Sequence, residues 1–557
     1  MNKGAAAKIR LSIMPFWSPL TPPLGISCLK AYLEQYGYDI HTKDYNTISA
    51  LYAYGNQYIS LIKSFIPSNE IGNVSMIGYD ILALHLCAYN NRENNDDYYE
   101  LVRLLILKNF FHKADDGFVE DLCKLVDCFY KLFSEHLMAE LNENEIDIYG
   151  ISCYSLTLGP SIFAFKLIKS NYPNIKTIMG GGVFADQLSP SFVDFAEFTE
   201  KTPFIDHFVI GEGEILFLNL IRSNFHNSPR VIINDNLIEK VCLNSVPSPD
   251  FSNFDMSSYP QLSAYTSRSC PYRCGFCSET MQWGEYRSKE SKDIVHELRS
   301  MVDRYNKNII VFADSLLNLN IDALADDMIL QPQNEKLYWD AYLRVCDMAN
   351  SMDTVTKWRK AGLYRVRLGV ESGSQKVLNL MNKRITVENI KTNIKTLAKA
   401  GIKISTYWVV GYPGETDEDF EDTLKLLREL KEYIYEADPH PYYFYPSGQA
   451  EKFGEKYNYE RVYPENYCKM LMFSTWQLNK EPLREKIYER LQLFDQCCSE
   501  CDIRNPYSLM EIYRADKRWK NIHASSVPMM HDLINKGVDI VDEYRDCIVL
   551  KHNNRNL

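Results

Sequence analysis

The stretch Ser269-Cys270-Pro271-Tyr272-Arg273-Cys274-Gly275-Phe276-Cys277 carries three cysteines at C-x3-C-x2-C spacing. It follows an apolar, strand-like segment at residues 262–268, so one loop can turn all three thiolates toward a single metal centre. Structural zinc sites take four ligands, usually from two paired motifs, and the sequence has no second pair nearby. A four-iron cluster held by three thiolates instead keeps one iron open for chemistry. The spacing therefore predicts an iron–sulfur cluster on Cys270, Cys274 and Cys277.

Three later segments accompany this triplet in order. They are Gly369-Val370-Glu371-Ser372-Gly373-Ser374, Gly411-Tyr412-Pro413-Gly414-Glu415-Thr416 and Tyr445-Pro446-Ser447-Gly448. Together with the triplet they resemble the radical S-adenosylmethionine (SAM) superfamily over residues 262 to about 449. The resemblance implies a partial (β/α)6 barrel and a [4Fe-4S] cluster that binds SAM and cleaves it reductively.

The same resemblance implies which residues contact SAM. Glu371 and Ser372 follow a strand and offer polar contacts, while Arg344 is suited to pair with the SAM carboxylate. Asp314 stands where many family members have Gly-Gly-Glu, and this departure leaves its role open. The expected SAM contacts are Phe276, Asp314, Arg344, Glu371, Ser372, Gly411 and Pro413. No catalytic acid or base is assigned.

The N-terminal part alternates strand and helix patterns, which is typical of a parallel α/β sheet. It resembles the cobalamin-binding domain of one radical SAM subgroup through the segments Pro22–Gly25, Gly150–Ser152, Gly180–Gly182 and Gly211–Glu214. The resemblance implies a Rossmann-like domain whose strand ends contact cobalamin through Ser152, Gly181, Gly182 and Glu212. The Asp-x-His-x-x-Gly motif that supplies a cobalt ligand elsewhere is absent, so any cobalamin is expected without a protein histidine ligand.

These patterns divide the chain into four parts. We expect a cobalamin-binding-like α/β domain at 1–234, interrupted by a helical insertion at about 47–144. A proline-rich linker follows at 235–260, then a radical SAM core at 261–449 and a helical C-terminal region at 450–557 with a small hairpin near its end. Cys497, Cys498 and Cys501 are interpreted as buried thiols, with an auxiliary cluster as the alternative.

Composition narrows the classes of partner. The 557 residues carry a net charge of −12, which disfavours a nucleic-acid substrate because such proteins usually present a basic surface. Mean hydropathy is −0.30, and neither a membrane span nor a signal peptide is apparent. Fifteen cysteines without a secretory signal favour reduced thiols or metal ligands. We therefore expect a cytoplasmic protein without a membrane partner.

The function predicted is cobalamin-dependent methylation of an unactivated carbon by a 5′-deoxyadenosyl radical. The resemblance also implies an electron donor such as flavodoxin or ferredoxin and a small-molecule or peptide substrate. Two alternatives stay open. One is a radical rearrangement, cyclisation or bond cleavage without a role for cobalamin, and the other is an iron–sulfur redox sensor or binding module. Substrate identity and oligomeric state are not encoded in any motif identified in the sequence.

Overall fold

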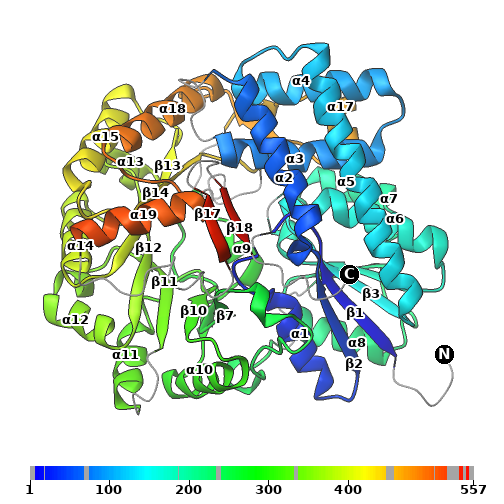
Figure 1. Cartoon of the computed structure of the whole chain (residues 1–557), viewed down its shortest axis with the longest axis horizontal. Coiled ribbons are helices and arrows are strands. Elements are labelled where there is room, and N and C mark those ends of the chain that lie inside the picture. Colours follow the sequence, from blue (N-terminus) through cyan, green and yellow to red (C-terminus); the bar gives the residue numbers. More distant parts are fainter. Residues whose placement is uncertain are drawn as a thin grey trace.

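The computed structural model contains two six-stranded parallel sheets that lie side by side (Figure 1). It describes residues 7–17, 19–67, 74–185, 187–233, 240–331, 337–446, 457–506, 509–523, 538–542 and 547–550. The N-terminal sheet and the central sheet are each made by consecutive βα units, as the alternating strand and helix patterns predict.

The N-terminal sheet has the strand order β2-β1-β3-β4-β5-β6, with every pair parallel. Its strands are β1 (Lys8–Ile13), β2 (Asp39–Asp44), β3 (Ile148–Ser152), β4 (Lys176–Gly180), β5 (His207–Ile210) and β6 (Val231–Ile233). The chain reverses its direction of winding between β1 and β3. In doubly wound sheets, ligands bind beside the carboxyl ends of the strands at such a switch point.

Alternating side chains bury both faces of this sheet. Ile9, Leu11 and Ile13 of β1 belong to a core shared with helices α1 (Leu24–Glu34) and α8 (Gly213–Arg222). Tyr149 and Ile151 of β3 instead join the core of α6 (Leu158–Asn171) and α7 (Val193–Lys201). The two-residue period of a strand thus places helices on both faces, as in a Rossmann-like domain.

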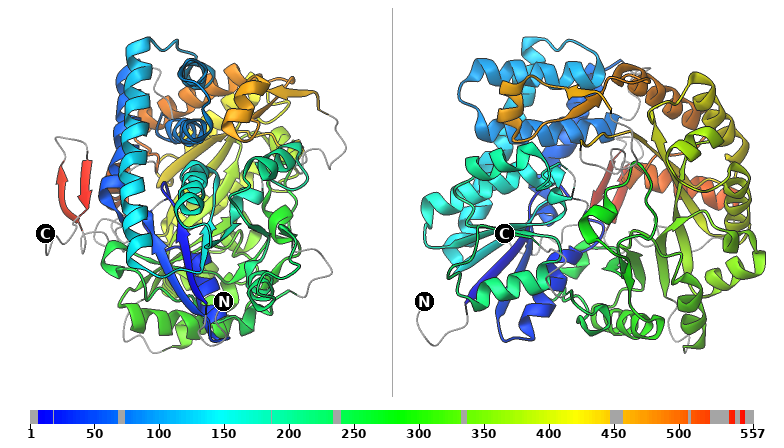
Figure 2. Two further views of the ribbon diagram at one scale, coloured as in Figure 1. Left: turned by 90° about the vertical axis from the view of Figure 1, so that its right-hand side faces the viewer. Right: turned by 180° about the vertical axis from the view of Figure 1, so that it is seen from behind.

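Four helices separate β2 from β3, where the sequence predicts a helical insertion. They are α2 (Ser49–Phe65), α3 (Val74–Asn91), α4 (Asn95–Phe110) and α5 (Asp116–Glu143). Helix α5 runs the length of one side of the molecule (Figure 2). The predicted apolar stripe of α5 is buried, including Leu122, Val126, Phe129 and Phe133. Asp115 caps α5 by accepting a hydrogen bond from Phe118 N at 2.8 Å.

The central sheet has the strand order β14-β13-β12-β11-β10-β7, which follows the chain. Its strands are β7 (Leu262–Ala264), β10 (Ile309–Phe312), β11 (Tyr338–Arg344), β12 (Leu363–Glu371), β13 (Lys403–Val410) and β14 (Glu436–Pro441). Helices between the strands are α10 (Ser291–Tyr305), α11 (Ile321–Leu330), α12 (Met352–Lys360), α13 (Gln375–Leu380), α14 (Val387–Lys399) and α15 (Asp417–Leu430). Sequential parallel neighbours are the arrangement expected of a partial (β/α)6 barrel.

The last strand of the central sheet differs from its expected position. An apolar pattern at residues 440–445 predicts a strand there, but β14 spans Glu436–Pro441. Its side chains Glu436, Asp438 and His440 alternate with Ala437, Pro439 and Pro441. Proline is tolerated because β14 pairs with β13 alone in the described sheet and so lies at its edge. The prediction followed the aromatic run Tyr442–Tyr445, which lies beyond the strand.

The C-terminal region combines helices with two short hairpins. Its helices are α17 (Glu465–Leu471), α18 (Arg484–Glu500) and α19 (Leu509–Ile522). The expected terminal hairpin is present as β17 (Val538–Asp542) and β18 (Cys547–Leu550). A second antiparallel pair of strands, β15 (Tyr459–Arg461) with β16 (Trp476–Leu478), was not expected from the sequence. Ser447 and Gly448 of the Tyr445–Gly448 motif lie outside the described residues.

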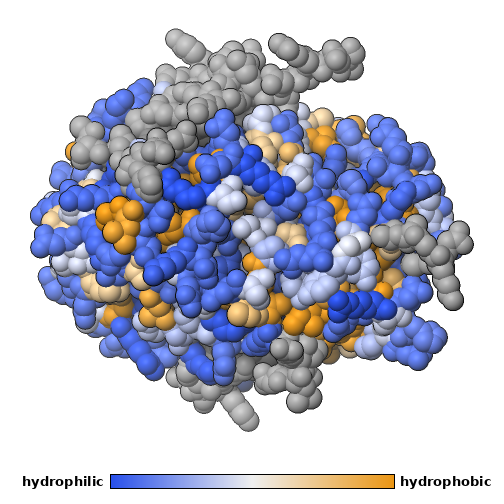
Figure 3. Space-filling view, turned by 90° about the horizontal axis from the view of Figure 1, so that it is seen from below, coloured by the Kyte–Doolittle hydropathy of each residue, from blue (hydrophilic) through white to orange (hydrophobic). Residues whose placement is uncertain are grey.

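One face of the molecule shows polar side chains with scattered apolar ones (Figure 3). In the part of the chain that the structure describes, no helix is both long and apolar enough to cross a bilayer.

Candidate functional site

The cysteine loop begins in a two-residue strand that is held from several sides. Strand β8 (Ser267–Arg268) pairs antiparallel with β9 (Arg287–Ser288). Asp314, at the end of β10, accepts hydrogen bonds from Thr266 N (2.9 Å) and from the hydroxyls of Thr266 (2.7 Å) and Ser267 (2.5 Å). Ser269 then adopts a positive φ of 72°, which turns the chain into the loop.

A cavity of about 530 Å³ opens at the carboxyl ends of the barrel strands. Cys270, Cys274 and Cys277 all line it. None of the cysteines in the described ranges forms a disulfide. Burial raises the pKa of the Cys277 thiol to about 12.

The donor set suits a cluster better than a single metal ion. Across the described residues, no three His, Cys, Asp or Glu side chains converge closely enough to share one ion. A four-iron cluster spreads three thiolates over three different irons, so its ligands do not meet at one point. Three cysteines on the wall of a roomy cavity fit that requirement.

Arg344, at the end of β11, lies against the cysteine loop. Its Nη1 donates to the sulfur of Cys274 over 3.4 Å, and its guanidinium carbon lies 4.0 Å from the centre of the Tyr272 ring. Arg344 is 6% exposed, and its Nη2 has no hydrogen-bond partner. A buried guanidinium with spare donor capacity beside the cysteines is suited to a carboxylate, as expected for SAM.

Glu371 ends β12 in an unusual backbone conformation, with φ of 68°. Its carboxylate receives a hydrogen bond of 2.5 Å from Nζ of Lys383, and both side chains line the cavity. Lys383 Nζ also lies 5.5 Å from the centre of the Phe276 ring. Strained backbone of this kind is concentrated at functional sites. The pair therefore joins the Gly369–Ser374 segment, here called the fourth-strand motif, to the cysteine loop.

The other expected SAM residues lie in different places. Phe276 and Asp314 line the same cavity as Arg344 and Glu371, although the Asp314 carboxylate is occupied by Thr266 and Ser267. Ser372 is fully buried, and its hydroxyl pairs with that of Thr423 at 3.2 Å. Ser372, Gly411 and Pro413 are absent from the lining of the cavity.

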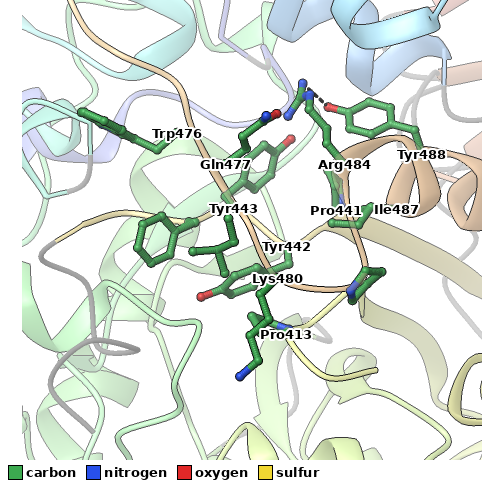
Figure 4. A pocket seen from close by; sticks show the side chains of 14 residues that line it. Pro413, Pro441, Tyr442, Tyr443, Trp476, Gln477, Lys480, Arg484, Ile487 and Tyr488 are labelled. Carbon is green, nitrogen blue, oxygen red and sulfur yellow. Dashed lines mark hydrogen bonds between the residues drawn. The ribbon is translucent and has the colours of Figure 1, made fainter. Parts of the chain in front are cut away.

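Gly411 and Pro413 line a second, narrower cavity instead (Figure 4). Its walls include Trp476, Lys480 and Arg484 from the C-terminal region. Arg484 donates to the hydroxyl of Tyr488 at 2.9 Å and to Asn109 Oδ1 at 2.6 Å, so it is anchored to the helical insertion. Pro441, Tyr442 and Tyr443 line both cavities and form the partition between them.

An aromatic wall on the far side from the cysteines was not predicted. Tyr342, Tyr407 and His440 extend from β11, β13 and β14, and the rings of Tyr407 and His440 are parallel within 10°. His440 Nε2 lies 3.2 Å from Asp438. Burial disfavours the charged imidazole, but Asp438 outweighs this effect and raises the pKa of His440. A correct position for β14 would have placed both residues on one strand face.

The helical insertion contacts Tyr443, which belongs to the partition between the two cavities. Asp80 on α3 accepts a hydrogen bond of 2.7 Å from the hydroxyl of Tyr443. Tyr443 keeps 39% of its surface accessible because it borders both cavities. Its ring is therefore fixed by a residue more than 300 positions away in sequence, which no local pattern reveals.

The expected cobalamin contacts lie at the carboxyl ends of the N-terminal strands, but the protein already engages them. A Cβ on Gly181 would lie 2.4 Å from the carbonyl oxygen of Cys153, and one on Gly182 would lie 3.0 Å from the Tyr154 ring. Glu212 forms ion pairs with Arg268 (3.0 Å) and Arg287. Ser152 ends β3 at the switch point. These glycines are thus explained by close packing of the chain itself.

The same strand ends nevertheless lie next to the central domain. Ser263 of β7 donates to the carbonyl of Pro22, in the loop after β1, at 2.8 Å. Burial is the main cause that raises the pKa of Tyr154, and the charge of Glu279, which lines the cavity, adds to it. Trp17 stacks on Tyr154 with 4.2 Å between ring centres. The loop after β1 therefore contacts β7 of the central sheet.

Residues 265–427 match the family model of the Radical SAM superfamily. This segment is a radical SAM domain. It contains the cysteine loop, Arg344 and Glu371, which the geometry brings together around one cavity. The cofactors of this superfamily are a [4Fe-4S] cluster and SAM, and the three thiols and the spare Arg344 donor fit them.

Two curated relatives are similar to this chain over more residues than the family model covers. An anaerobic magnesium-protoporphyrin IX monomethyl ester cyclase of Cereibacter sphaeroides is 26% identical over 317 residues, which cover 52% of this chain and 51% of that protein. An uncharacterized methyltransferase of Pyrococcus horikoshii is 26% identical over 345 residues, covering 57% and 70%. The chain spans about half the length of the cyclase.

A solved structure matches almost the whole chain. The radical S-adenosylmethionine methyltransferase TsrM from Kitasatospora setae, solved with cobalamin and a [4Fe-4S] cluster bound, superposes with a TM-score of 0.58. The match covers 96% of this chain and 99% of that chain at 13% identity. The two proteins share a fold, including the α/β domain that precedes the radical SAM domain.

Proposed function

We propose that this chain is a radical SAM enzyme that transfers a methyl group to an unactivated carbon with the help of cobalamin. The cluster, when bound, supplies the electron that cleaves SAM to methionine and a 5′-deoxyadenosyl radical. The observation that carries the proposal is the cavity lined by Cys270, Cys274 and Cys277 together with Arg344 and Glu371.

The residues of the chain have distinct roles in this proposal. Arg344 holds the SAM carboxylate through its spare Nη2 and donates to the Cys274 ligand through Nη1. Glu371 is held in place by its hydrogen bond from Lys383 and accepts hydrogen bonds from SAM hydroxyl or amino groups. Asp314 is a positioning residue, because its carboxylate fixes the strand that leads into the cysteine loop.

The N-terminal domain binds cobalamin in this proposal, and cobalamin supplies the methyl group. Support comes from the switch point between β1 and β3 and from the contact of the loop after β1 with β7 of the central sheet. Gly181, Gly182 and Glu212 are engaged within the protein, so no step is assigned to them. Bringing two cofactors to one cavity removes the entropy cost of a separate encounter.

A small molecule or a peptide is the proposed substrate, and a flavodoxin or ferredoxin the proposed electron donor. The net charge of −12 supports a substrate other than nucleic acid. A cytoplasmic location and the lack of a membrane partner belong to the same proposal.

The experiment that tests the cluster is anaerobic purification and reconstitution, followed by iron and sulfide analysis. Wild-type protein is expected to hold iron and sulfide and to form 5′-deoxyadenosine from SAM with dithionite. The C270A/C274A/C277A variant is expected to lose all three properties. The matched control is C497A/C498A/C501A, since Cys497 and Cys498 are buried on α18. If the first variant retained iron and the control lost it, we would instead assign the cluster to the cysteines of the C-terminal region.

Hydroxocobalamin tests the second cofactor. One equivalent is expected to bind to wild-type protein, measured by the visible spectrum after gel filtration. A protein that forms 5′-deoxyadenosine but binds no hydroxocobalamin would support the rearrangement alternative instead. An intact cluster that leaves SAM uncleaved would support the redox sensor.

A further inference from the structure

Four charged side chains gather behind the cysteine loop, at the boundary between the two sheets. Glu212 and Glu214 lie at the start of α8, just after β5 of the N-terminal domain, and Arg268 and Arg287 come from β8 and β9. Arg268 pairs with Glu212 at 3.0 Å and with Glu214 at 2.5 Å, and Arg287 pairs with Glu212. We call these residues the arginine–glutamate quartet.

The two arginines lie opposite each other in the β8–β9 pair. Like charges at directly opposed positions repel, and the side chains lie on the same face of the hairpin. Arg268 is 8% exposed, so water screens little of this repulsion. The β8–β9 pair therefore needs both glutamate carboxylates to neutralise its two arginines, and both glutamates belong to the N-terminal domain.

The quartet adjoins the predicted cluster ligands along the chain. Arg268 precedes Cys270 by two residues, and the intervening Ser269 has a positive φ of 72° and donates from its hydroxyl to Gly284 O at 2.7 Å. Asp314 fixes the other side of β8 through Ser267. Because few rotatable bonds separate Arg268 from the cysteine loop, a displacement of Arg268 also displaces the loop.

We propose that Glu212 and Glu214 are positioning residues for the iron–sulfur cluster, and that the quartet sets the charge balance of the cysteine loop. This inference rests on the proposed function. The two carboxylates neutralise the two guanidinium groups, so the N-terminal domain contributes to the cluster environment without supplying a ligand. Cluster potentials depend on nearby charge, hydrogen bonds and solvent exposure.

Charge-changing variants test this with a readout that loss of structure alone would not produce. Glu214→Gln leaves one positive charge uncompensated, which favours the reduced cluster, so its midpoint potential is expected to rise. Arg268→Gln leaves one negative charge, so the potential is expected to fall. The measurement is a dithionite titration of reconstituted protein, followed by electron paramagnetic resonance. Arg268→Lys keeps the charge and is expected to restore a potential near the wild-type value.

The matched control breaks a buried ion pair elsewhere in the barrel. Lys403 begins β13, at the end of the sheet away from the cysteine loop, and pairs with Asp516 at 2.6 Å. Asp516→Asn is expected to leave the potential unchanged. Equal shifts in Glu214→Gln and Arg268→Gln, or no shift in either, would overturn the inference.

Failure of the proposed function is a separate result. A wild-type protein that binds no cluster after reconstitution contradicts the proposed function itself. A wild-type protein with a normal cluster, whose potential is insensitive to both variants, contradicts the quartet alone. If a glutamine variant loses its iron, the conservative Glu214→Asp variant is measured in its place, with a smaller rise expected.

Discussion

Nη1 of Arg344 lies 3.4 Å from the sulfur of Cys274, which places a guanidinium directly against a predicted cluster ligand. The two residues are 70 positions apart, one at the end of β11 and the other in the loop after β8. Their contact links the site that would hold the SAM carboxylate to the site that would hold iron.

Arg344→Ala is expected to weaken SAM binding about tenfold or more, because a charge-assisted hydrogen bond contributes roughly 1.5–3 kcal/mol. The measurement is the change in the electron paramagnetic resonance signal of the reduced cluster as SAM is added. Arg484→Ala is the control, since Arg484 is anchored at the second cavity. Equal SAM affinity in wild type and Arg344→Ala would remove Arg344 from the proposed site.

Glu371→Gln is expected to destabilise the protein by about 3 kcal/mol, because it leaves the Lys383 ammonium buried without its counter-ion. Each side chain of this pair is 7% exposed, so solvent screening is slight. The double variant Glu371→Gln/Lys383→Met is expected to be more stable than the single one. Urea unfolding measures both. A double variant less stable than the single one would show that the pair is not the source of the loss.

Stability above pH 4 is expected to depend on Asp495 of α18. Burial, reinforced by Asp438, raises the pKa of this carboxyl to about 8 in the folded protein. Because the folded pKa exceeds the unfolded value of about 3.9, the folded state holds the proton more tightly. This contribution to stability is fully present below pH 4 and is lost as the pH rises through about 8.

The isosteric variant Asp495→Asn removes this dependence. Above pH 8 it is expected to be more stable than wild type by several kcal/mol, on the order of 3–5. Below pH 4 the two proteins are expected to be equally stable. Urea unfolding at pH 4, 6 and 8 measures the difference, and a difference that does not grow with pH would contradict the prediction.

Gly181→Ala is expected to cost more than about 2 kcal/mol, since its Cβ would clash with Cys153 and its φ is +108°. Gly37→Ala separates the two causes, because Gly37 also has a positive φ of +81° but no heavy atom within 4 Å of the added Cβ. Its expected cost is about 1 kcal/mol. Similar melting temperatures for the two variants would mean that the backbone relaxes around Cys153.

The sequence predicts the strands that follow a simple apolar pattern. Residues 403–410 are β13 as expected, because the strand is bracketed by a helix on each side. The same reasoning fails at β14, where Glu436, Asp438 and His440 alternate with an alanine and two prolines. The Glu436 carboxylate accepts a hydrogen bond from the Ser405 hydroxyl of β13 at 2.7 Å and lies 3.9 Å from Arg365 of β12, and hydropathy does not register such pairs.

The candidate site, like the fold, is predictable only where residues close together in sequence determine it. The cysteine spacing and the fourth-strand motif identify one cavity, since local sequence fixes both of them. The roles of Asp314 and Glu212 depend on residues from other elements, Ser267 in one case and Arg268 in the other. The sequence alone does not distinguish a carboxylate at a strand end that contacts a cofactor from one that contacts a neighbouring domain.

The partition of Tyr442 and Tyr443 has a consequence for the size of ligand that the protein accepts. Both rings border two chambers, so a rotation of either ring enlarges one chamber at the expense of the other. The hydrogen bond from Tyr443 to Asp80 of α3 restrains the Tyr443 ring, so the helical insertion affects how space is divided between the two chambers. A helix that contributes no side chain to the lining of the cysteine-lined chamber thereby affects the shape of that chamber.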